Sequence, residues 1–341
     1  MGALRGSRRH VRFIGLSLVI PIAQKGARAG ARVRPVGATA SARNPEGSAG
    51  WPAGVFPTAA LARGAWLLPP GSGRREAARR AATRLLDAGV GTAAAMRRVE
   101  RQAEAAARAA QRTEVLALAV YAPDGAHDMA AATGELRRSR HEVRLALGAM
   151  GRATPPLRPD TGREQMTGGK FANLNELLGE VEELPEWLLV LDDDVRLPRG
   201  FLDRLIGVAQ ALALDLCQPA LTWHSHGAWR VTRRRPVLAR RTRFVEIGPV
   251  TLMRRRVAEV VTPFSEAGMG WGQCLHWGAL AERHGWRLGI IDAAPVRHDR
   301  RRTASAYGEA EALAAARAYL AEHEHISYAR ASETLESIRS L

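Results

Sequence analysis

The sequence contains few cysteines, hardly any lysine and few aromatic residues. Its two cysteines, Cys217 and Cys274, provide neither a disulfide framework nor the spacing of a metal site, which is compatible with a reducing compartment. Lysine occurs only at Lys25 and Lys170, so nearly every basic residue is an arginine. The best candidate for a targeting segment, the mostly apolar residues 13–23, is too short to span a bilayer. These features favour a cytoplasmic protein.

The positive charge is concentrated at one end of the chain. Of the formal net charge of +16, residues 1–112 carry 20 Lys and Arg against 5 Asp and Glu, whereas residues 113–341 carry 30 against 29. Residues 1–73 have the composition of a disordered basic leader or of an over-extended gene start. We expect this leader to associate peripherally with a membrane surface. We expect no nucleic-acid partner, because the leader has few aromatic residues for stacking on bases.

From residue 113 onward, strand-like and helix-like patterns alternate. The expected strands are 114–121, 141–147, 187–191, 216–223, 243–253 and 286–291. The expected helices are 127–140, 170–178, 199–213 and 272–284, and residues 151–168 are expected to form a loop. This alternation is typical of βαβ units, so we predict an α/β domain over 113–302 with a mostly parallel, Rossmann-like sheet flanked by helices. Residues 74–112 are predicted to be a helical N-terminal extension and 303–341 a helical C-terminal tail.

Three consecutive carboxylates, Asp192, Asp193 and Asp194, directly follow the unbroken apolar run 187–191. Such a run is typical of a strand buried in a parallel sheet, and ligands bind beyond the carboxyl ends of these strands. Like charges at this spacing raise one another's pKa unless a cation lies among them, and oxygen ligands suit Mg²⁺ or Mn²⁺. The triplet therefore predicts a metal site. The alternative is a solvated acidic turn in which Asp194 helps to cap the next helix.

Several other polar residues are candidates with open alternatives. Glu246 interrupts an apolar strand, where a carboxylate is costly to bury without a partner, and is therefore a site candidate. His224 and His226 are two residues apart, so on a strand both side chains would face the same side and could bind zinc. A zinc site needs a third ligand, and none is evident. Trp229 either stacks on a sugar or belongs to the core. The arginines between 233 and 241 either hold an anionic group or form a solvated charge run.

The order of these segments resembles that of the GT-A nucleotide-sugar glycosyltransferases, particularly glycosyltransferase family 2 and related bacterial and plant glycosyltransferase-like proteins. The matching features are a first strand ending at Tyr121, the segment 168–175 with Lys170, the Asp-x-Asp of Asp192 and Asp194, the strand at 245–249 leading to Arg254 and Arg255, and the segments 269–272 and 296–298. The resemblance covers roughly 114–298. It implies the GT-A fold and metal-dependent, inverting transfer of a sugar from a nucleoside-diphosphate donor to a hydroxyl of a glycan, lipid or small molecule.

The resemblance also implies a role for each matched residue. Asp194 and His298 would bind Mn²⁺ or Mg²⁺, although His298 is equally well explained as a surface histidine before a charged run. The nucleotide-sugar site would comprise Tyr121, Lys170, Asn173, Asp192 and Asp193. The acceptor side would comprise His226, Trp229 and Trp271.

One expected residue is missing. Inverting transfer needs a general base, which relatives carry as an aspartate after the segment 270–272, whereas this chain has Gln273 and Cys274 there. Cys274 could act as a base only with electropositive help, for example from His276. Otherwise Glu246, Glu266 or Asp292 substitutes. The alternative is a catalytically impaired protein of the same fold that binds nucleotide sugars or glycans without transferring them.

Overall fold

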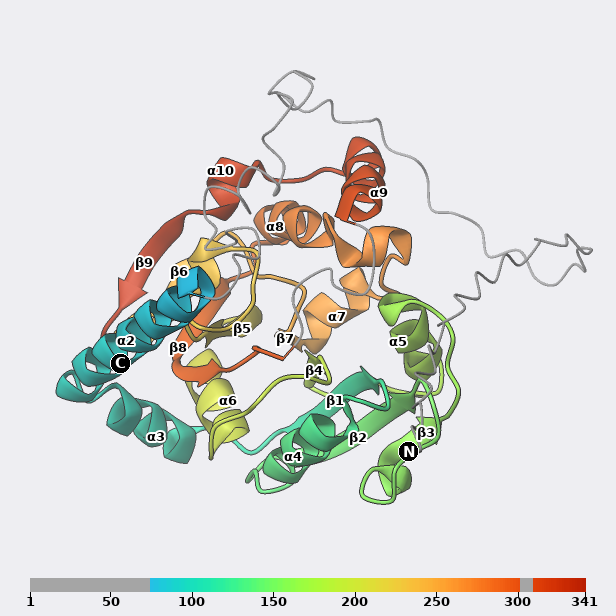
Figure 1. Cartoon of the computed structure of the whole chain (residues 1–341), viewed down its shortest axis with the longest axis horizontal. Helices are drawn as coiled ribbons and strands as arrows, with labels where there is room; N and C mark the ends of the chain where they lie inside the picture. The colour runs from blue at the N-terminus through green and yellow to red at the C-terminus, as the bar shows by residue number, and fades with distance from the viewer. Residues whose placement is uncertain (1–73, 301–308) are drawn as a thin grey trace, which may run out of the picture. The chain divides into compact units, whose positions relative to one another are not determined.

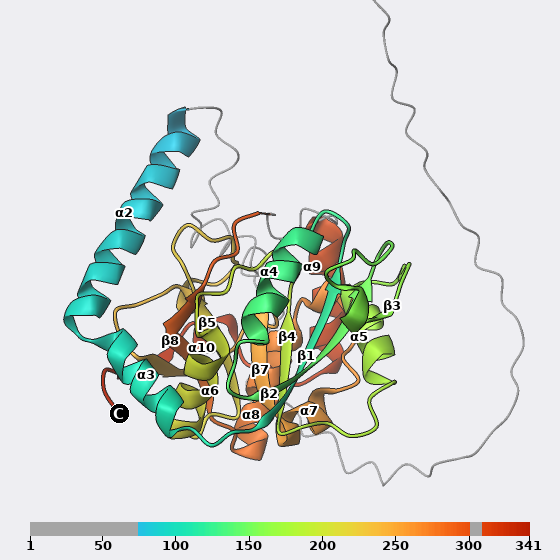
Figure 2. The same cartoon turned by 90° about the horizontal axis from the view of Figure 1, so that it is seen from below.

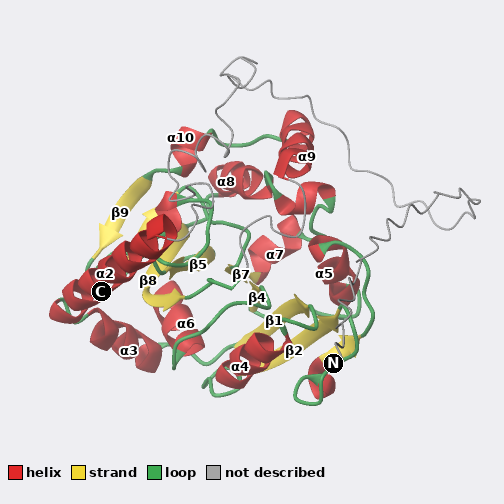
Figure 3. Ribbon diagram, in the orientation of Figure 1, coloured by secondary structure: helices red, strands yellow, loops and turns green. Residues whose placement is uncertain are grey.

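The computed structural model describes residues 74–300 and 309–341, which contain a nine-stranded sheet and its helices (Figures 1 and 3). The predicted leader and its membrane contact lie outside the described residues. The strands are β1 (Glu114–Tyr121), β2 (Glu142–Ala149), β3 (Thr161–Arg163), β4 (Trp187–Leu191), β5 (Leu216–Leu221), β6 (Ala239–Thr242), β7 (Val250–Arg254), β8 (Leu288–Val296) and β9 (Thr334–Ile338). The helices are α2 (Arg74–Met96), α3 (Val99–Ala109), α4 (Ala126–Leu136), α5 (Lys170–Leu178), α6 (Phe201–Ala211), α7 (Arg255–Val261), α8 (Gln273–His284), α9 (Glu309–Glu322) and α10 (Tyr328–Ala331).

The strand order in the sheet is β3-β2-β1-β4-β7-β5-β8-β6-β9. The pairs β3–β2, β2–β1, β1–β4 and β5–β8 are parallel. Strand β7 runs antiparallel between β4 and β5, and β6 runs antiparallel between β8 and β9. Seven of the nine strands therefore point the same way, which confirms the α/β class and the mostly parallel sheet. Strands β1, β4, β5 and β8 all end at one edge of the sheet, and β7 begins there.

Helices cover both faces of the sheet (Figures 1 and 2). Along β1, Val115, Ala117 and Ala119 belong to a core cluster with α3, α4 and α6. Leu116 and Leu118 belong to a second cluster with α5, α7 and α8 on the other face. This alternation is the two-residue period of a strand. Strand β4 is buried along its whole length, which explains why its sequence is apolar at every position.

The predicted N-terminal extension packs on the domain through α3. Val99, Ala103 and Ala106 are buried, and a Cβ atom on Gly207 of α6 would lie 2.6 Å from the backbone nitrogen of Ala107. Small residues on both helices therefore allow their backbones to approach closely. None of the described helices combines the length and the hydropathy of a membrane span.

Three predicted segments differ from the structure. Residues 151–168 were expected to be a loop but contain β3, which is only three residues long. Residues 243–253 were expected to be one strand, but 243–249 are irregular because the chain must cross β8 and β5 to pass from β6 to β7. The tail was expected to be helical, yet it ends with β9 paired to β6. By contrast, the predicted bounds of α5 and β4 are confirmed.

Candidate metal centre

The candidate site lies at the sheet edge where the parallel strands end. Ala122 follows β1, the three aspartates follow β4, the turn 222–226 follows β5, and His298 lies beyond β8. The segment 246–249 reaches the same edge because β7 starts there. These five segments meet at the place where open α/β sheets bind ligands.

Asp194 and His298 are brought together although they are far apart in the sequence. Arg196 N donates to Arg297 O at 2.8 Å and Arg297 N donates to Arg196 O at 3.2 Å, which joins the two segments. His298 Nε2 then lies 3.0 Å from Asp194 Oδ1, with the two side chains 12% and 4% exposed. Burial opposes a charge on this imidazole, but the hydrogen bond and negative charge of Asp194 outweigh it and raise the pKa of His298.

The turn after β5 holds the other side of His298. Ser225 Oγ accepts a hydrogen bond from His298 N at 3.0 Å, and His298 Nδ1 lies 3.2 Å from the carbonyl oxygen of His226. A carbonyl oxygen only accepts, so this contact places a proton on Nδ1. In the neutral imidazole the lone pair is then on Nε2, the atom that faces Asp194.

Asp192, Asp194 and His298 form a group that fits a divalent cation. Each offers one potential ligand atom, and these atoms lie within 4.8 Å of one another. Two carboxylates and one imidazole supply oxygen and nitrogen ligands of the kinds that bind divalent cations. The alternative capping role of Asp194 is wrong, because α6 begins only at Phe201 and its N-cap residue is Gly200.

Asp193 has a different role from the acids on either side of it. Its Oδ2 accepts a hydrogen bond from Ala122 N at 2.8 Å, and the side chain is buried. This bond ties the end of β4 to the end of β1. The acidic triplet therefore contains two candidate ligands and, between them, one residue that stabilises the strand ends.

Lys170, the first residue of α5, forms an ion pair with Asp192 through Nζ and Oδ1. Both side chains are about a quarter exposed. A Cβ atom on Gly248 would lie 3.2 Å from Lys170 Nζ and 3.3 Å from Asp192 Oδ2. Gly248 therefore leaves room for this pair at the rim of the candidate metal centre.

Glu246 lies in the bend that leads to β7. The residue is half-buried, but its Oε2 is shielded from solvent and has no hydrogen-bond partner among the described residues. Burial raises the pKa of Glu246 to about 7, against the opposing effect of the positive charge of Arg233. A carboxyl group with this pKa can accept a proton near neutral pH.

Cys274, predicted to occupy the position of the base, is buried in the first turn of α8. Burial, together with the nearby Glu246 carboxylate, raises the pKa of the Cys274 thiol to about 12. Among the described contacts, His276 does not place a positive charge beside Cys274. His276 Nδ1 instead lies 2.6 Å from the carbonyl oxygen of Glu324, and burial lowers the pKa of its imidazole. This environment keeps the Cys274 thiol protonated near neutral pH and so does not favour it as the base.

No protein-family model matches this chain, and no curated protein is similar to it. Among solved structures, the chain is similar to a crystal structure of GalNAc-T7 with UDP, GalNAc and Mn²⁺, with a TM-score of 0.41 and 11% sequence identity. The match covers 56% of this chain and 44% of that chain, so this chain spans less than half of that structure's length.

Three predicted site residues have mainly structural contacts. Tyr121 is buried, with its hydroxyl 3.0 Å from Thr161 Oγ1. Asn173 is buried and donates from Nδ2 to the carbonyl of Gly168 at 3.0 Å, which fixes the start of α5. Trp229 is buried between two core aromatic rings with centroids 4.3 and 4.8 Å away. Of the two explanations for Trp229, the core position is therefore confirmed.

The arginines after Trp229 also support the fold. Arg233 donates to the carbonyls of residues 222, 225 and 227 at 2.8–3.1 Å. Arg240 is fully buried and pairs with Asp292 at 2.8 and 3.0 Å. Arg240 therefore belongs neither to a solvated run nor to an anion site, and Arg233 supports the turn after β5. Asp292 is correspondingly unsuited to replace the missing base.

The remaining candidates lie around the rim. Glu266 is exposed, with Oε1 3.3 Å from Asn175 Nδ2, and Trp271 is half-buried against the core cluster that includes α8 and α9. His224 Nδ1 contacts Asp87 of α2, whereas His226 holds His298 through backbone atoms, so the two histidines do not form a zinc pair. No local pattern indicates the role of Asp87, which depends on contact with a turn 136 residues further on.

Proposed function

We propose that the protein is a metal-dependent glycosyltransferase of the GT-A fold that transfers a sugar from a nucleoside-diphosphate donor to a hydroxyl acceptor. The observation that carries this proposal is the convergence of Asp192, Asp194 and His298 at the carboxyl edge of the sheet. These ligands fit Mn²⁺ or Mg²⁺. Such an ion supplies a Lewis acid that offsets negative charge on the nucleoside-diphosphate leaving group.

The surroundings of this group support a diphosphate as the ligand. Lys170 places a compact positive charge beside Asp192 at the rim. Lys170 also begins α5, whose N-cap residue Gly169 makes no side-chain capping bond, so the first-turn N–H groups are suited to an anion. The acceptor in this proposal is a glycan, a lipid or a small molecule that carries a hydroxyl group.

In this proposal Glu246 replaces the missing aspartate as the general base. The acceptor oxygen bonds to the anomeric carbon as its proton passes to Glu246. The bond from the sugar to the diphosphate breaks, and its electron pair stays on the leaving group, so the configuration at the sugar is inverted. A pKa of about 7 supports this role, because a general base is most effective when its pKa is close to the working pH.

The second candidate is a protein of the same fold that binds nucleotide sugars or glycans without transferring them. It is favoured by Cys274, which is a buried neutral thiol at the position where relatives carry an acid. The transferase and a nucleotide-sugar-binding protein share donor binding and differ in turnover.

Calorimetric titration with nucleoside diphosphates, with and without Mn²⁺, tests both candidates. We expect binding that requires the ion and that is lost in Asp194→Asn but retained in Glu104→Gln, which alters an exposed carboxylate of α3. Release of nucleoside diphosphate from a panel of nucleotide sugars and acceptors then measures transfer. Transfer that is lost in Glu246→Gln while donor binding remains would support the transferase, and binding without turnover would support the second candidate. The absence of any nucleoside-diphosphate binding would refute the transferase and a nucleotide-sugar-binding protein, and would leave only glycan binding.

A further inference from the structure

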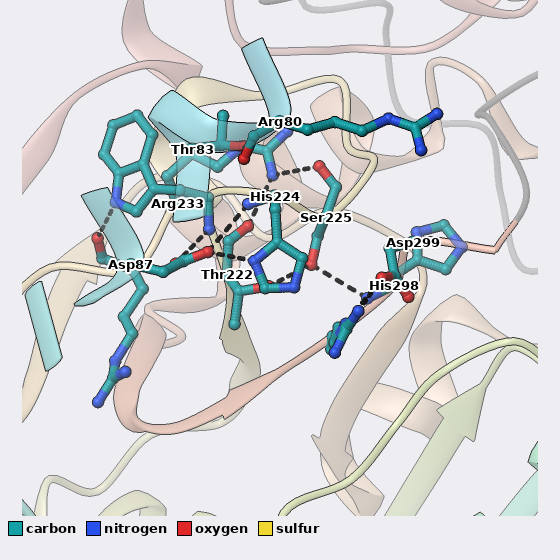
Figure 4. A network of polar contacts seen from close by, with 12 residues as sticks. Arg80, Thr83, Asp87, Thr222, His224, Ser225, Arg233, His298 and Asp299 are labelled. Atoms are coloured by element: carbon teal, nitrogen blue, oxygen red, sulfur yellow. Dashed lines mark hydrogen bonds and ion pairs between the residues drawn. The ribbon is translucent and has the colours of Figure 1, made fainter. Parts of the chain in front are cut away.

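Helix α2 contacts the turn beside the candidate metal centre through a carboxylate. Asp87 Oδ1 accepts a hydrogen bond from Trp223 N at 2.7 Å, and Asp87 Oδ2 accepts one from His224 N at 3.1 Å (Figure 4). His224 Nδ1 also contacts Oδ2. The Asp87 and His224 side chains are only 15% and 21% exposed. Two successive backbone N–H groups and one imidazole therefore converge on a single, largely buried carboxylate, and such charge-assisted bonds are stronger than neutral ones.

The turn that Asp87 holds is the turn that positions His298. Figure 4 shows Thr222, His224 and Ser225 between Asp87 and His298. Thr222 Oγ1 lies 2.6 Å from Ser225 Oγ, and Ser225 Oγ accepts from His298 N at 3.0 Å. One residue further on, the carbonyl of His226 contacts His298 Nδ1 at 3.2 Å. A continuous path of hydrogen bonds and turn backbone thus runs from α2 to a candidate metal ligand.

Arg233 and Asp87 hold this turn in complementary ways. Arg233 donates to carbonyl groups of the turn, whereas Asp87 accepts from its N–H groups. Together they satisfy backbone groups of an irregular segment that has no ladder partner at these positions. Removal of either side chain would leave polar groups of the turn to find new partners.

Around Asp87, apolar burial contributes little to the placement of α2, although Ala94 near the end of this helix is buried in the core. Leu85 and Leu86, beside Asp87, are 74% and 39% exposed, so neither serves as a buried anchor. The hydrophobic effect is proportional to the apolar area removed from water, and it is therefore small over this part of the helix. The directional contacts of Asp87 accordingly help to fix this part of α2 against the turn.

We infer that Asp87 is a positioning residue for His298, acting through the turn 222–226, and that α2 is part of the functional unit. The inference rests on the proposed metal site. Outer hydrogen-bond partners orient a ligating histidine, and their loss typically lowers metal affinity about 10- to 100-fold. Because Asp87 acts through an intervening turn, we expect a loss near the lower end of this range, about tenfold.

The test uses the full chain and Mn²⁺ alone, with free Mn²⁺ measured by electron paramagnetic resonance. Asp87→Asn keeps the size of the side chain but turns one acceptor oxygen into a donor facing the N–H groups of the turn. We expect Mn²⁺ binding about tenfold weaker than in the unmodified protein. Glu104→Gln, which neutralises an exposed carboxylate on the adjacent helix α3, is the matched control and should bind Mn²⁺ as the unmodified protein does.

A double-mutant cycle separates positioning from a general loss of structure. In a His298→Ala background, Asp87→Asn should cause no further loss of Mn²⁺ affinity. Equal losses in both backgrounds, or an unchanged affinity in Asp87→Asn alone, would overturn the inference. If circular dichroism shows that Asp87→Asn does not fold, Ser225→Ala tests the same path. We expect the same loss of Mn²⁺ affinity in this variant, and an unchanged affinity would overturn the inference. Absence of Mn²⁺ binding by the unmodified protein would refute the metal site itself, so the two failures are distinguishable.

Discussion

Replacement of Glu246 by glutamine should stabilise the protein at alkaline pH and, if Glu246 is the proposed base, should slow transfer. Burial raises the pKa of Glu246 from 4.5 to about 7, so the folded protein keeps this proton over a pH range in which the unfolded chain has lost it. Relative to the glutamine variant, the unmodified protein should therefore be most stable below about pH 4.5. It should lose stability as the pH rises, with the loss complete above about pH 7.

The separation between 4.5 and about 7 corresponds to about 3 kcal/mol, at about 1.4 kcal/mol per pKa unit. About 2 kcal/mol of this falls between pH 5 and pH 8. Urea unfolding, followed by tryptophan fluorescence, gives the unfolding free energies of Glu246→Gln and of the unmodified protein at these two pH values. The difference between the two proteins should be larger at pH 8 than at pH 5 by this amount. If Glu246 is the base, transfer should fall by about 10² to 10⁴ in the same variant.

Glu266→Gln controls for the loss of a negative charge, since Glu266 is exposed. A stability difference between Glu246→Gln and the unmodified protein that is the same at pH 5 and pH 8 would refute the argument from burial. Retained transfer in Glu246→Gln would refute only its role as a base. The two measurements therefore test the environment of the carboxyl group and its chemistry separately.

Two further predictions concern buried positions. Gly207→Ala should destabilise the protein by about 1–3 kcal/mol, because the new Cβ would lie 2.6 Å from the backbone nitrogen of Ala107. The loss of stability would be measured as a lower Tm. An unchanged Tm would contradict the close approach of α3 and α6. Iodoacetamide at pH 8 should leave Cys274 unmodified in the folded protein, because the thiol is buried with its pKa raised to about 12, and should modify it after unfolding in urea. Mass spectrometry distinguishes these outcomes, and rapid modification of the folded protein would contradict the burial of Cys274.

The elements with strong local signals could be predicted from the sequence. Strand β4 is buried on both faces and is therefore apolar throughout, and helix α5 follows directly on the Gly168–Gly169 pair. Strand β9 could not be predicted, because its residues are largely exposed and show no apolar alternation. The irregular path at 243–249 follows from the order of strands in the sheet, which no local pattern encodes.

The candidate ligands could be predicted because Asp192 and Asp194 directly follow a buried strand, and because His298 occurs at the expected place in the order of segments. The roles of other residues depend on tertiary contacts. The high pKa of Cys274 results from its burial in the packed first turn of α8, which spacing alone did not reveal. The role of Asp87 likewise depends on a tertiary contact, because its partners lie in the turn after β5, 136 residues further on.

The bridge between Arg196 and Arg297 has a thermodynamic consequence. It joins segments that the unfolded chain keeps apart, so a site made by Asp194 and His298 exists only in the folded protein. Any ion that binds there therefore stabilises the folded state by mass action. At a free ion concentration of 100 times the Kd this gain is about 2.7 kcal/mol, so the occupancy of the centre would appear directly in the melting temperature of the domain.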